Sequence, residues 1–506
     1  MSLLAVDIGS SACKAVAFAA GGEILAQHSS GFIPEFPQPG FAEMPANKFW
    51  DALCTSCRAV AHDLADHDLT DPVQALCLSS HGETFVAVDA QGKPLRNAIL
   101  NQDSRALRES MRCEEIVGRE RLFHIAGHQT HPMYPIPKIL WLREHEPEIF
   151  ASTYSFLTLI GFLLQKMGLP PYVDYSLASR FLAFDITKRA WSDEILSAVD
   201  LQKSCLPESV PAGTIAGKLN SEAARELGLP PGIPAVLGGH DQPCGALGSG
   251  VTSDGRVSDS MGTYECLLAA SDAPSLNETA LKVSLNTYCH VVPGKYVTLA
   301  YFPSGIMVKW FHDLLYANGS GAAPASTNAH DRESSHYEFL EDHSPAGPTG
   351  LCITPHLIGT CNPEFNPRVR GFIGGLNPGT DRAHIYKGIL EGLACELLVV
   401  SEGLAEAVGG FDDIYVTGGG TRSVLGLRLR AALTGRRLHV MKQQEAVCLG
   451  TAILAGVAIG EYSSIDQAVA ALVGENRVVV PDSATADSYL TLCAQYRQLR
   501  SVAVQA

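Results

Sequence analysis

The chain has 506 residues, of which 46% are hydrophobic and 18% are charged, and its formal net charge is −16. Because a single hydrophobic core stops growing at roughly 250–300 residues, this length predicts two domains. The acidic balance disfavours a broad nucleic-acid surface or an anionic membrane surface, so we expect neither a nucleic-acid nor a membrane partner.

The cysteine pattern indicates where the protein works. The fourteen cysteines stand in apolar contexts, for example Cys77, Cys395 and Cys448, which is typical of a reduced cytosol. Cys54 and Cys57 have CxxC spacing, but no second pair or histidine follows at zinc spacing. We therefore predict a cytoplasmic protein in which this pair holds no metal.

The first thirty residues predict a β-meander. Residues 3–8 have strand character, a Gly/Ser turn follows at 9–12, and a short apolar segment ends at Gly21-Gly22 before another strand. Phosphate loops of the P-loop and Rossmann kinds lead directly into a long helix, and the sequence contains no GxxxxGK[ST] motif. Neither kind of loop is expected here.

The first turn of this meander carries candidate phosphate contacts. Asp7 ends the strand, and Gly9, Ser10, Ser11 and Lys14 follow it. Small residues let backbone N–H groups approach phosphate oxygens, hydroxyls add donors, and the lysine adds a positive charge. Asp7 could hold Mg²⁺ through water, because Mg²⁺ keeps most of its hydration shell. An ordinary hairpin turn with Asp7 as an Asx cap explains the same residues equally well.

A second hairpin is predicted over 84–100, and a strand over 234–237 then leads into the segment GGHDQ at 238–242. Asp241 therefore stands at the C-terminal edge of a strand, where open α/β sheets place their ligand sites. A carboxylate there can accept the proton of a hydroxyl that attacks phosphorus, typically worth about 10²–10⁴ in rate. The alternative is that Asp241 caps a helix over 244–247.

The strand–turn–strand pattern of the N-terminus recurs over 255–269, with Gly262 and Thr263 in the turn, and this echo predicts two related domains. The least apolar stretch, 317–350, is predicted to be a mobile surface excursion. A strand over 412–416 then leads through the glycines 418–420, which suit close packing on a flat adenosine, into a helix over 422–433. The predicted fold is α/β, with two mixed-sheet domains and a cleft between them.

The order of these motifs resembles that of the FGGY carbohydrate kinases, and further matching stretches lie at 40–43, 101–105, 138–141, 174–180 and 304–305. The resemblance implies two ribonuclease H-like domains of the type shared with actin and Hsp70, over 1–247 and 248–506. It also implies ATP-dependent phosphorylation of a hydroxyl of a small sugar, either a xylulose-like ketose or a polyol, with ATP and Mg²⁺ as cofactors.

The resemblance assigns roles to individual residues as well. Asp241 would be the catalytic base, and Asp7 would support Mg²⁺. The expected ATP contacts are Gly9, Ser10, Ser11, Lys14, Gly262, Thr263, Gly305, Gly419, Gly420 and Ser423. The expected sugar contacts are His81, Glu83, Tyr134, Asp241 and Gln242, with His81 less direct than Glu83.

Departures from the family pattern bear on the substrate. Glycerol kinases carry an arginine just before the glutamate, whereas this chain has Gly82, so glycerol is not the expected acceptor. Glu83 with the Asp241–Gln242 pair is not the usual xylulose kinase set, although residues 127–138 resemble that branch. The acceptor and the oligomeric state stay open, with a homodimer as one arrangement. The alternative function is a non-catalytic nucleotide- or sugar-binding protein on the same fold.

Overall fold

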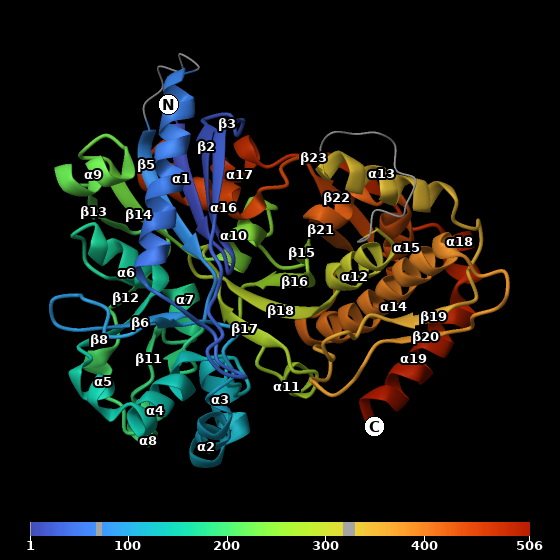
Figure 1. Ribbon diagram of the computed structural model, residues 1–506, viewed down its shortest axis with the longest axis horizontal. Helices are drawn as coiled ribbons and strands as arrows, with labels where there is room; N and C mark the ends of the chain where they lie inside the picture. The colour runs from blue at the N-terminus through green and yellow to red at the C-terminus, as the bar shows by residue number, and fades with distance from the viewer. Residues whose placement is uncertain (1, 67–72, 317–328, 506) are drawn as a thin grey trace.

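Two mixed sheets, one from each half of the chain, form the centres of the two lobes seen in Figure 1. The computed structural model describes residues 2–66, 73–316 and 329–505. The strand order is β13-β14-β5-β1-β2-β3 in the first sheet and β17-β18-β16-β15-β21-β22-β23 in the second. This arrangement confirms the predicted α/β class with mixed sheets.

The N-terminal sheet consists of β1 (Ser2–Ile8), β2 (Ala12–Ala19), β3 (Ile24–Gly31), β5 (Val73–Ser80), β13 (Ile215–Lys218) and β14 (Pro234–His240). β1 pairs antiparallel with β2 and parallel with β5, β2 pairs antiparallel with β3, and β5 pairs parallel with β14. The predicted β-meander is thus confirmed as β1–β2–β3.

Helices cover both faces of this sheet, and one of them comes from the other half of the chain. Successive strand side chains point to opposite faces. Leu4 and Val6 pack in the core that includes α1 (Asn47–Asp66). Leu3 and Ala5 pack in the core that includes α16 (Ala446–Ala458), together with α10 (Asp241–Gly248). The apolar run 447–459 therefore lies inside the molecule, on the N-terminal sheet.

A smaller part of the first lobe lies below this sheet in Figure 1. It contains a four-stranded sheet of β4 (Glu43–Met44), β7 (Ala98–Ile99), β6 (Phe85–Val88) and β8 (Ser155–Thr158). The predicted second hairpin is confirmed, because β6 pairs antiparallel with β7. The helices here include α2 (Leu107–Val117), α3 (Arg119–Ala126), α4 (Pro135–His145), α6 (Leu159–Lys166) and α7 (Tyr175–Ser179).

The C-terminal sheet repeats the arrangement of the first. Its strands are β15 (Arg256–Met261), β16 (Tyr264–Ser271), β17 (Asn286–Cys289), β18 (Tyr296–Pro303), β21 (Asp413–Thr417), β22 (Arg437–Met441) and β23 (Glu475–Val479). β15 pairs antiparallel with β16 and parallel with β21, as β1 pairs with β2 and β5. The predicted echo between the two halves is confirmed.

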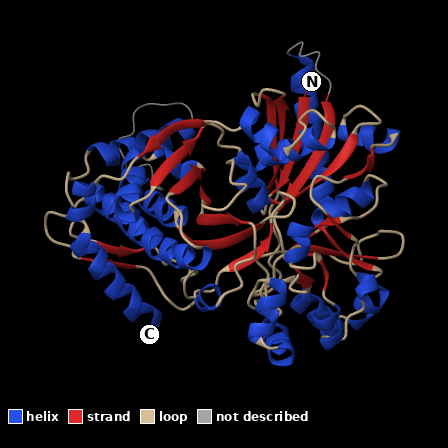
Figure 2. Cartoon of the chain, turned by 180° about the vertical axis from the view of Figure 1, so that it is seen from behind, coloured by secondary structure: helices blue, strands red, loops and turns tan. Residues whose placement is uncertain are grey.

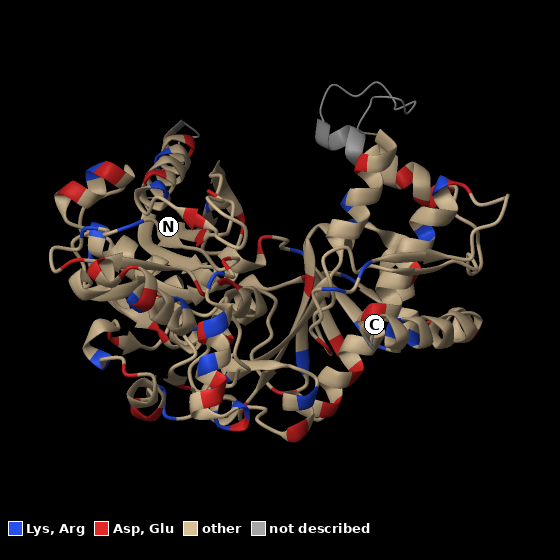
Figure 3. Ribbon diagram, turned by 60° about the horizontal axis from the view of Figure 1, so that its bottom comes forward, with Lys and Arg blue, Asp and Glu red and all other residues tan. Residues whose placement is uncertain are grey.

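The helices of the C-terminal lobe include α12 (Gly305–Tyr316), α14 (Arg382–Val408), α15 (Val424–Thr434) and α19 (Leu490–Gln505). Their apolar side chains share a core with β15, β16, β18 and β21. Figure 2 shows from behind that helices flank the strands of both lobes. The described helices include none that is long and apolar enough to cross a membrane. Acidic and basic residues are interspersed along the ribbon of both lobes in Figure 3.

The predicted excursion over 317–350 needs a correction. Residues 317–328 lie outside the described residues, and Ala329–Asp342 forms helix α13, which packs beside α14. The low apolar content of this segment reflects a helix at the surface rather than a continuous loop, because such a helix needs only one apolar stripe.

Candidate active site

The C-terminal ends of β1, β14, β15 and β21 meet at two adjoining cavities. The first has a volume of about 230 Å³, and the residues that line it include Asp7, Lys14, Asp241, Gln242, Ser258, Ser260, Thr417, Gly418, Gln444 and Glu445. The second has a volume of about 840 Å³, and its lining includes Gly262, Thr263, Gly305, Gly419, Gly420 and Ser423. Neighbours in sequence border different cavities, since Gly418 lines the first and Gly419 the second.

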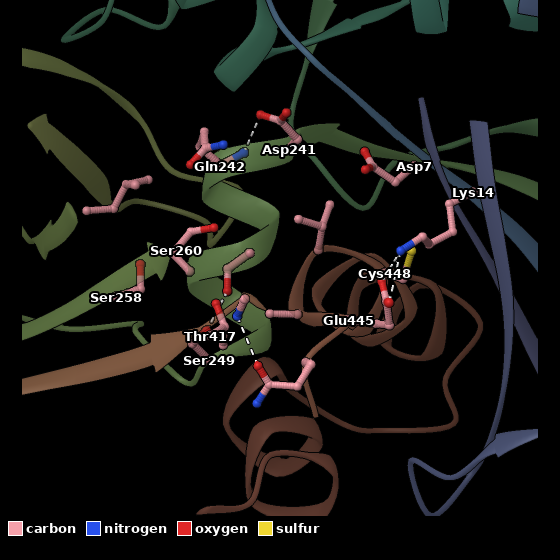
Figure 4. Close-up of a pocket in the computed structure, with 17 residues that line it drawn as sticks. Asp7, Lys14, Asp241, Gln242, Ser249, Ser258, Ser260, Thr417, Glu445 and Cys448 are labelled. Carbon is pink, nitrogen blue, oxygen red and sulfur yellow. Dashed lines mark hydrogen bonds and ion pairs between the residues drawn. The ribbon is translucent and has the colours of Figure 1, made fainter. Parts of the chain in front are cut away.

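Asp7 and Lys14 face the first cavity from the first hairpin. They are directly opposite each other in the antiparallel register of β1 and β2, so their side chains lie on one face of the sheet. The Asp7 carboxylate accepts a hydrogen bond from Ser79 Oγ at 3.1 Å. Burial raises the pKa of Asp7 to about 6. Lys14 Nζ donates to both carboxylate oxygens of Glu445, at 2.9 and 2.7 Å (Figure 4).

The turn between these strands is tight and open to solvent. Gly9 N–H donates to the carbonyl of Ala12 at 2.9 Å, which closes the turn. Ser10 and Ser11 are exposed at its tip. Neither serine lines either of the two cavities.

Asp241 is the first residue of α10 and faces the same cavity as Asp7 (Figure 4). Its carboxylate accepts from the backbone N–H of Gln242 at 2.6 Å. Burial, followed by the negative charges of Asp7 and Glu83, raises the pKa of Asp241 well above its usual range. The helix cap is His240, whose side chain accepts from Gln242 N–H, so the alternative role of Asp241 as the cap is wrong.

Close packing around β14 accounts for the two glycines before His240. A Cβ on Gly238 would lie 2.6 Å from the carbonyl oxygen of Leu78 in β5. Gly239 has a φ of +130°, and a Cβ there would lie 2.7 Å from Ser176 Oγ and 2.9 Å from an Asp174 carboxylate oxygen. The glycines thus let β14 approach both β5 and α7, which fixes Asp241 at the end of the strand.

Two of the predicted sugar contacts, Glu83 and Tyr134, are buried and line neither cavity. Glu83 has a φ of +62°, a left-handed conformation that costs a non-glycine residue on the order of 1–3 kcal/mol. Lys138 Nζ donates to the Glu83 carbonyl at 3.2 Å, and the Glu83 carboxylate pairs with Arg180 Nε. Tyr134 is buried, and its hydroxyl donates to Asn286 Oδ1 at 3.0 Å.

His81 has a different environment from the other predicted sugar contacts. One ring nitrogen lies 3.0 Å from the Ile8 carbonyl oxygen and the other lies 2.7 Å from Thr84 Oγ1. Burial lowers the pKa of His81. Both nitrogens thus have partners inside the protein, and they join the end of β1 to the start of β6.

The second cavity is bordered by the second hairpin. Gly305, at the start of α12, donates its N–H to the Gly262 carbonyl at 3.0 Å, which holds the turn with Thr263 against the helix. A Cβ on Gly305 would lie 2.5 Å from that carbonyl oxygen, and a Cβ on Gly420 would lie 2.8 Å from the Cβ of Met261. Ser423 caps α15 through its hydroxyl, which accepts from Gly426 N–H at 2.9 Å.

A buried ion pair lies beside this cavity. It was not predicted from the sequence. Arg430 donates to both carboxylate oxygens of Glu265, at 2.9 and 2.7 Å. Ser304 Oγ donates to the same carboxylate at 2.7 Å. Asp259 is fully buried beside them, and burial with the charge of Glu265 raises the pKa of Asp259 well above its usual range. Burial and the neighbouring charge therefore favour the protonated form of Asp259.

Two further residues were missed. Arg180 lies within the stretch 174–180, which matched the family pattern, but only the folded chain brings it to Glu83. Glu445 is the residue immediately before α16, and its carboxylate pairs with Lys14, which also lines the first cavity. No local motif marks either pair.

The residues at the first cavity fit Mg²⁺ and phosphate. The described residues include no cluster of three or more His, Cys, Asp or Glu side chains able to hold a metal directly. Mg²⁺ needs only one or two protein carboxylates when phosphates and water complete its shell. Asp7 is a buried carboxylate with a raised pKa that faces the cavity, so a cation there would offset its desolvation.

Comparison with known proteins gives the family. Residues 2–248 match the N-terminal domain of the FGGY family of carbohydrate kinases, and residues 257–459 match its C-terminal domain. A xylulose kinase of Staphylococcus xylosus is 23% identical over 500 residues, which cover 98% of this chain and 99% of that protein. A gluconokinase of Bacillus licheniformis is 26% identical over 493 residues, which cover 97% of this chain and 94% of that protein.

The fold agrees with the family. The crystal structure of a ligand-bound xylulose kinase from Lactobacillus acidophilus matches with a TM-score of 0.87 at 20% identity, and the match covers 99% of this chain and 98% of that one. These comparisons support an enzyme and not the non-catalytic alternative. The two domain matches together span most of the sequence, and the chain belongs to the FGGY family of carbohydrate kinases.

Proposed function

We propose that the protein transfers the γ-phosphoryl group of Mg-ATP to a hydroxyl of a small ketose or polyol, with Asp241 as the general base. The observation that carries this proposal is the meeting of Asp7, Lys14 and Asp241 at one cavity of about 230 Å³. A base, a cation and a metal-supporting carboxylate are the groups that phosphoryl transfer requires, because that reaction depends on positioning and charge stabilisation.

Asp241 would accept the proton of the attacking hydroxyl. Its raised pKa, caused by burial and by Asp7 and Glu83, makes the ionised carboxylate a stronger base than an exposed aspartate. The Gln242 N–H holds one carboxylate oxygen and leaves the other free to point at the acceptor. Tyr134 and Glu83 would position the sugar beside it.

The phosphates would lie between the two hairpin turns. Backbone N–H groups at Ser10 and Ser11 in one lobe and at Thr263 in the other would donate to phosphate oxygens. The N–H groups of Gly9 and Gly262 close the two turns on Ala12 and Tyr264, and these glycines would let the backbone come close to the phosphates. Lys14 would exchange the carboxylate of Glu445 for a phosphate oxygen. Mg²⁺, held through water at Asp7, would supply positive charge against the phosphates.

The adenosine would occupy the cavity of about 840 Å³. Gly419, where an added Cβ would meet nothing within 4 Å, offers backbone that a flat ring can approach closely, whereas Gly305 and Gly420 let the chain pack against Gly262 and Met261. Ser423 borders the same space. Closure of the two lobes around both ligands would exclude water, which competes with the sugar as acceptor. The domain limits 1–247 and 248–506, the cytoplasmic location and the homodimer stay predictions.

The test is a coupled ADP-release screen with Mg-ATP over ketopentoses, ketohexoses, tetritols, pentitols and glycerol. We expect one class of acceptor to stimulate ADP release strongly over the acceptor-free rate, with phosphosugar formed in equal amount. A protein that binds ATP by calorimetry but shows no stimulation by any acceptor would contradict the proposal.

A further inference from the structure

The buried residues around Glu83 and Tyr134, which we call the acceptor wall, include an arginine that already has a partner. Arg180 follows α7 directly, and its guanidinium pairs with the Glu83 carboxylate, with both side chains at most 5% exposed. Removing either partner would leave a buried charge without its counter-ion, so the pair is fixed in place.

Aromatic rings hold the Arg180 guanidinium from two sides. Its central carbon lies 5.2 Å from the ring centre of Tyr134 and 5.0 Å from that of Tyr288, within cation–π range. Nδ1 of His128 lies 3.5 Å from Nη1 of the same guanidinium. Among the described residues, the buried Tyr288 hydroxyl has no hydrogen-bond partner. A buried hydroxyl without a partner, next to the proposed base, is a group that an acceptor hydroxyl can satisfy.

Residue 82 has no room for a side chain beside this ion pair. A Cβ on Gly82 would lie 2.7 Å from His240 Cδ2 and 3.1 Å from Arg180 Cγ. Glu83 itself has the left-handed backbone described above, held by Lys138. The guanidinium of Arg180 lies close enough to the proposed base that its positive charge opposes the rise in the pKa of Asp241, which burial causes.

The charges around this wall do not favour an anion. Burial, and then the negative charges of Asp7 and Glu83, raise the pKa of Asp241. Burial lowers the pKa of the neighbouring histidines, which keeps His81, His128 and His240 neutral. Lys138 is buried with a pKa lowered to about 7, and its Nζ is directed at two backbone carbonyls. Arg180 is therefore the main positive charge here, and Glu83 neutralises it.

We propose that Arg180 is a specificity-determining residue, and that its pairing with Glu83 selects uncharged polyhydroxy acceptors and rejects acceptors that carry a carboxylate. A hydroxyl can donate to Glu83 and accept from Arg180 at the same time, whereas a carboxylate can only accept. A carboxylate placed here would also face Glu83 and Asp241 without a free cation. This inference rests on the proposed function and names the substrate class of the same site.

The test compares two acceptors of equal length, a pentitol and the corresponding five-carbon aldonate, by kcat/KM with Mg-ATP. We expect the wild-type protein to prefer the pentitol by about 100-fold or more, since sites built for hydroxyl hydrogen bonds discriminate strongly. Glu83→Gln keeps the shape of the side chain but frees the charge of Arg180. We expect it to shift the ratio of aldonate to pentitol at least about tenfold toward the aldonate, one decade being about 1.4 kcal/mol.

Matched variants separate this effect from a general change of charge. Glu445→Gln removes a carboxylate from the other side of the cavity and should leave the ratio unchanged. The double variant Glu83→Gln/Arg180→Gln lacks both charges and should lose the gain in aldonate use. A purely structural role of the pair would lower kcat/KM for both acceptors equally.

Three results would overturn the inference: equal use of both acceptors by the wild-type protein, a preference for the aldonate, or an unchanged ratio in Glu83→Gln. If Glu83→Gln does not fold, Arg180→Lys, which keeps the charge but loses the planar guanidinium, should lower pentitol use and leave aldonate use low. If no acceptor is phosphorylated at all, the proposed function fails. Calorimetric binding of the two acceptors then decides the inference alone, since tighter aldonate binding would overturn it.

Discussion

Replacing Asp241 by asparagine should separate catalysis from stability. Asparagine keeps the size of the side chain and an oxygen that can accept from Gln242 N–H, now at 2.6 Å, so the start of α10 is preserved. It cannot accept the proton of the attacking hydroxyl. Loss of a general base typically lowers the rate by about 10²–10⁴, which corresponds to about 2.7–5.4 kcal/mol in the activation free energy.

The stability should move in the other direction. Burial and the charges of Asp7 and Glu83 raise the pKa of Asp241 above its unfolded value, so the folded protein binds the proton more tightly. The stability gained from this proton is present below about pH 4, the ordinary aspartate pKa, and is lost as the pH rises through the folded pKa. Asparagine does not ionise. At a pH above the folded pKa the variant should therefore melt at the same temperature or higher, and its advantage should shrink toward pH 4.

The assay measures kcat by coupled ADP release with the best acceptor, and the melting temperature by calorimetry on the same preparation. Asp413→Asn is the matched control, because Asp413 pairs with Arg437 at the start of β21, at the other end of the strand from Thr417. Its kcat should not change. Near-normal transfer by a folded Asp241→Asn variant, or a fall in melting temperature parallel to the loss of activity, would refute the reasoning.

Three further predictions concern the nucleotide side. Because burial raises the pKa of Asp7 to about 6, Mg-ATP affinity measured by calorimetry should fall about tenfold per pH unit below that value. Asp7→Asn should show only the shallower slope of ATP itself. Arg430→Met leaves Glu265 buried without its partner and should lower the free energy of unfolding by about 3–5 kcal/mol in denaturant titration. Gly305→Ala places a Cβ 2.5 Å from the Gly262 carbonyl oxygen and should raise KM for ATP. The first prediction is contradicted if Mg-ATP affinity does not change with pH, and the second if the denaturation midpoint of Arg430→Met is unchanged. An unchanged KM for ATP in Gly305→Ala would contradict the third.

Much of the fold could be predicted because its signals are local. Alternating apolar residues and the glycine turns indicate both hairpin units, and β1–β2–β3 and β15–β16 have them where expected. The position of α16 could not be predicted. Its run over 447–459 is apolar on all sides, which indicates burial but does not say which sheet the helix covers. Only the tertiary fold shows that it packs against β1, β5 and β14.

The candidate site shows the same limit. Motifs at strand ends placed Asp7, Lys14 and Asp241, and the structure brings these three to one cavity. The ion pairs behind the cavities join residues far apart in sequence, and Glu83 and Arg180 are 97 positions apart. No periodicity or spacing links such residues, because the pairing depends on how the sheets and helices are stacked.

The two hairpin units of the chain use corresponding strands for different chemistry. In the first unit, Asp7 faces the cavity. In the second, Ser258 and Ser260 face the cavity, so Asp259 between them must point to the opposite face of β15. There it lies beside the Glu265–Arg430 pair, where burial favours its protonated form. The Asp7 carboxylate therefore faces the cavity, and the Asp259 carboxylate faces the core of the C-terminal lobe. The two-residue period of a strand determines the face to which each side chain points.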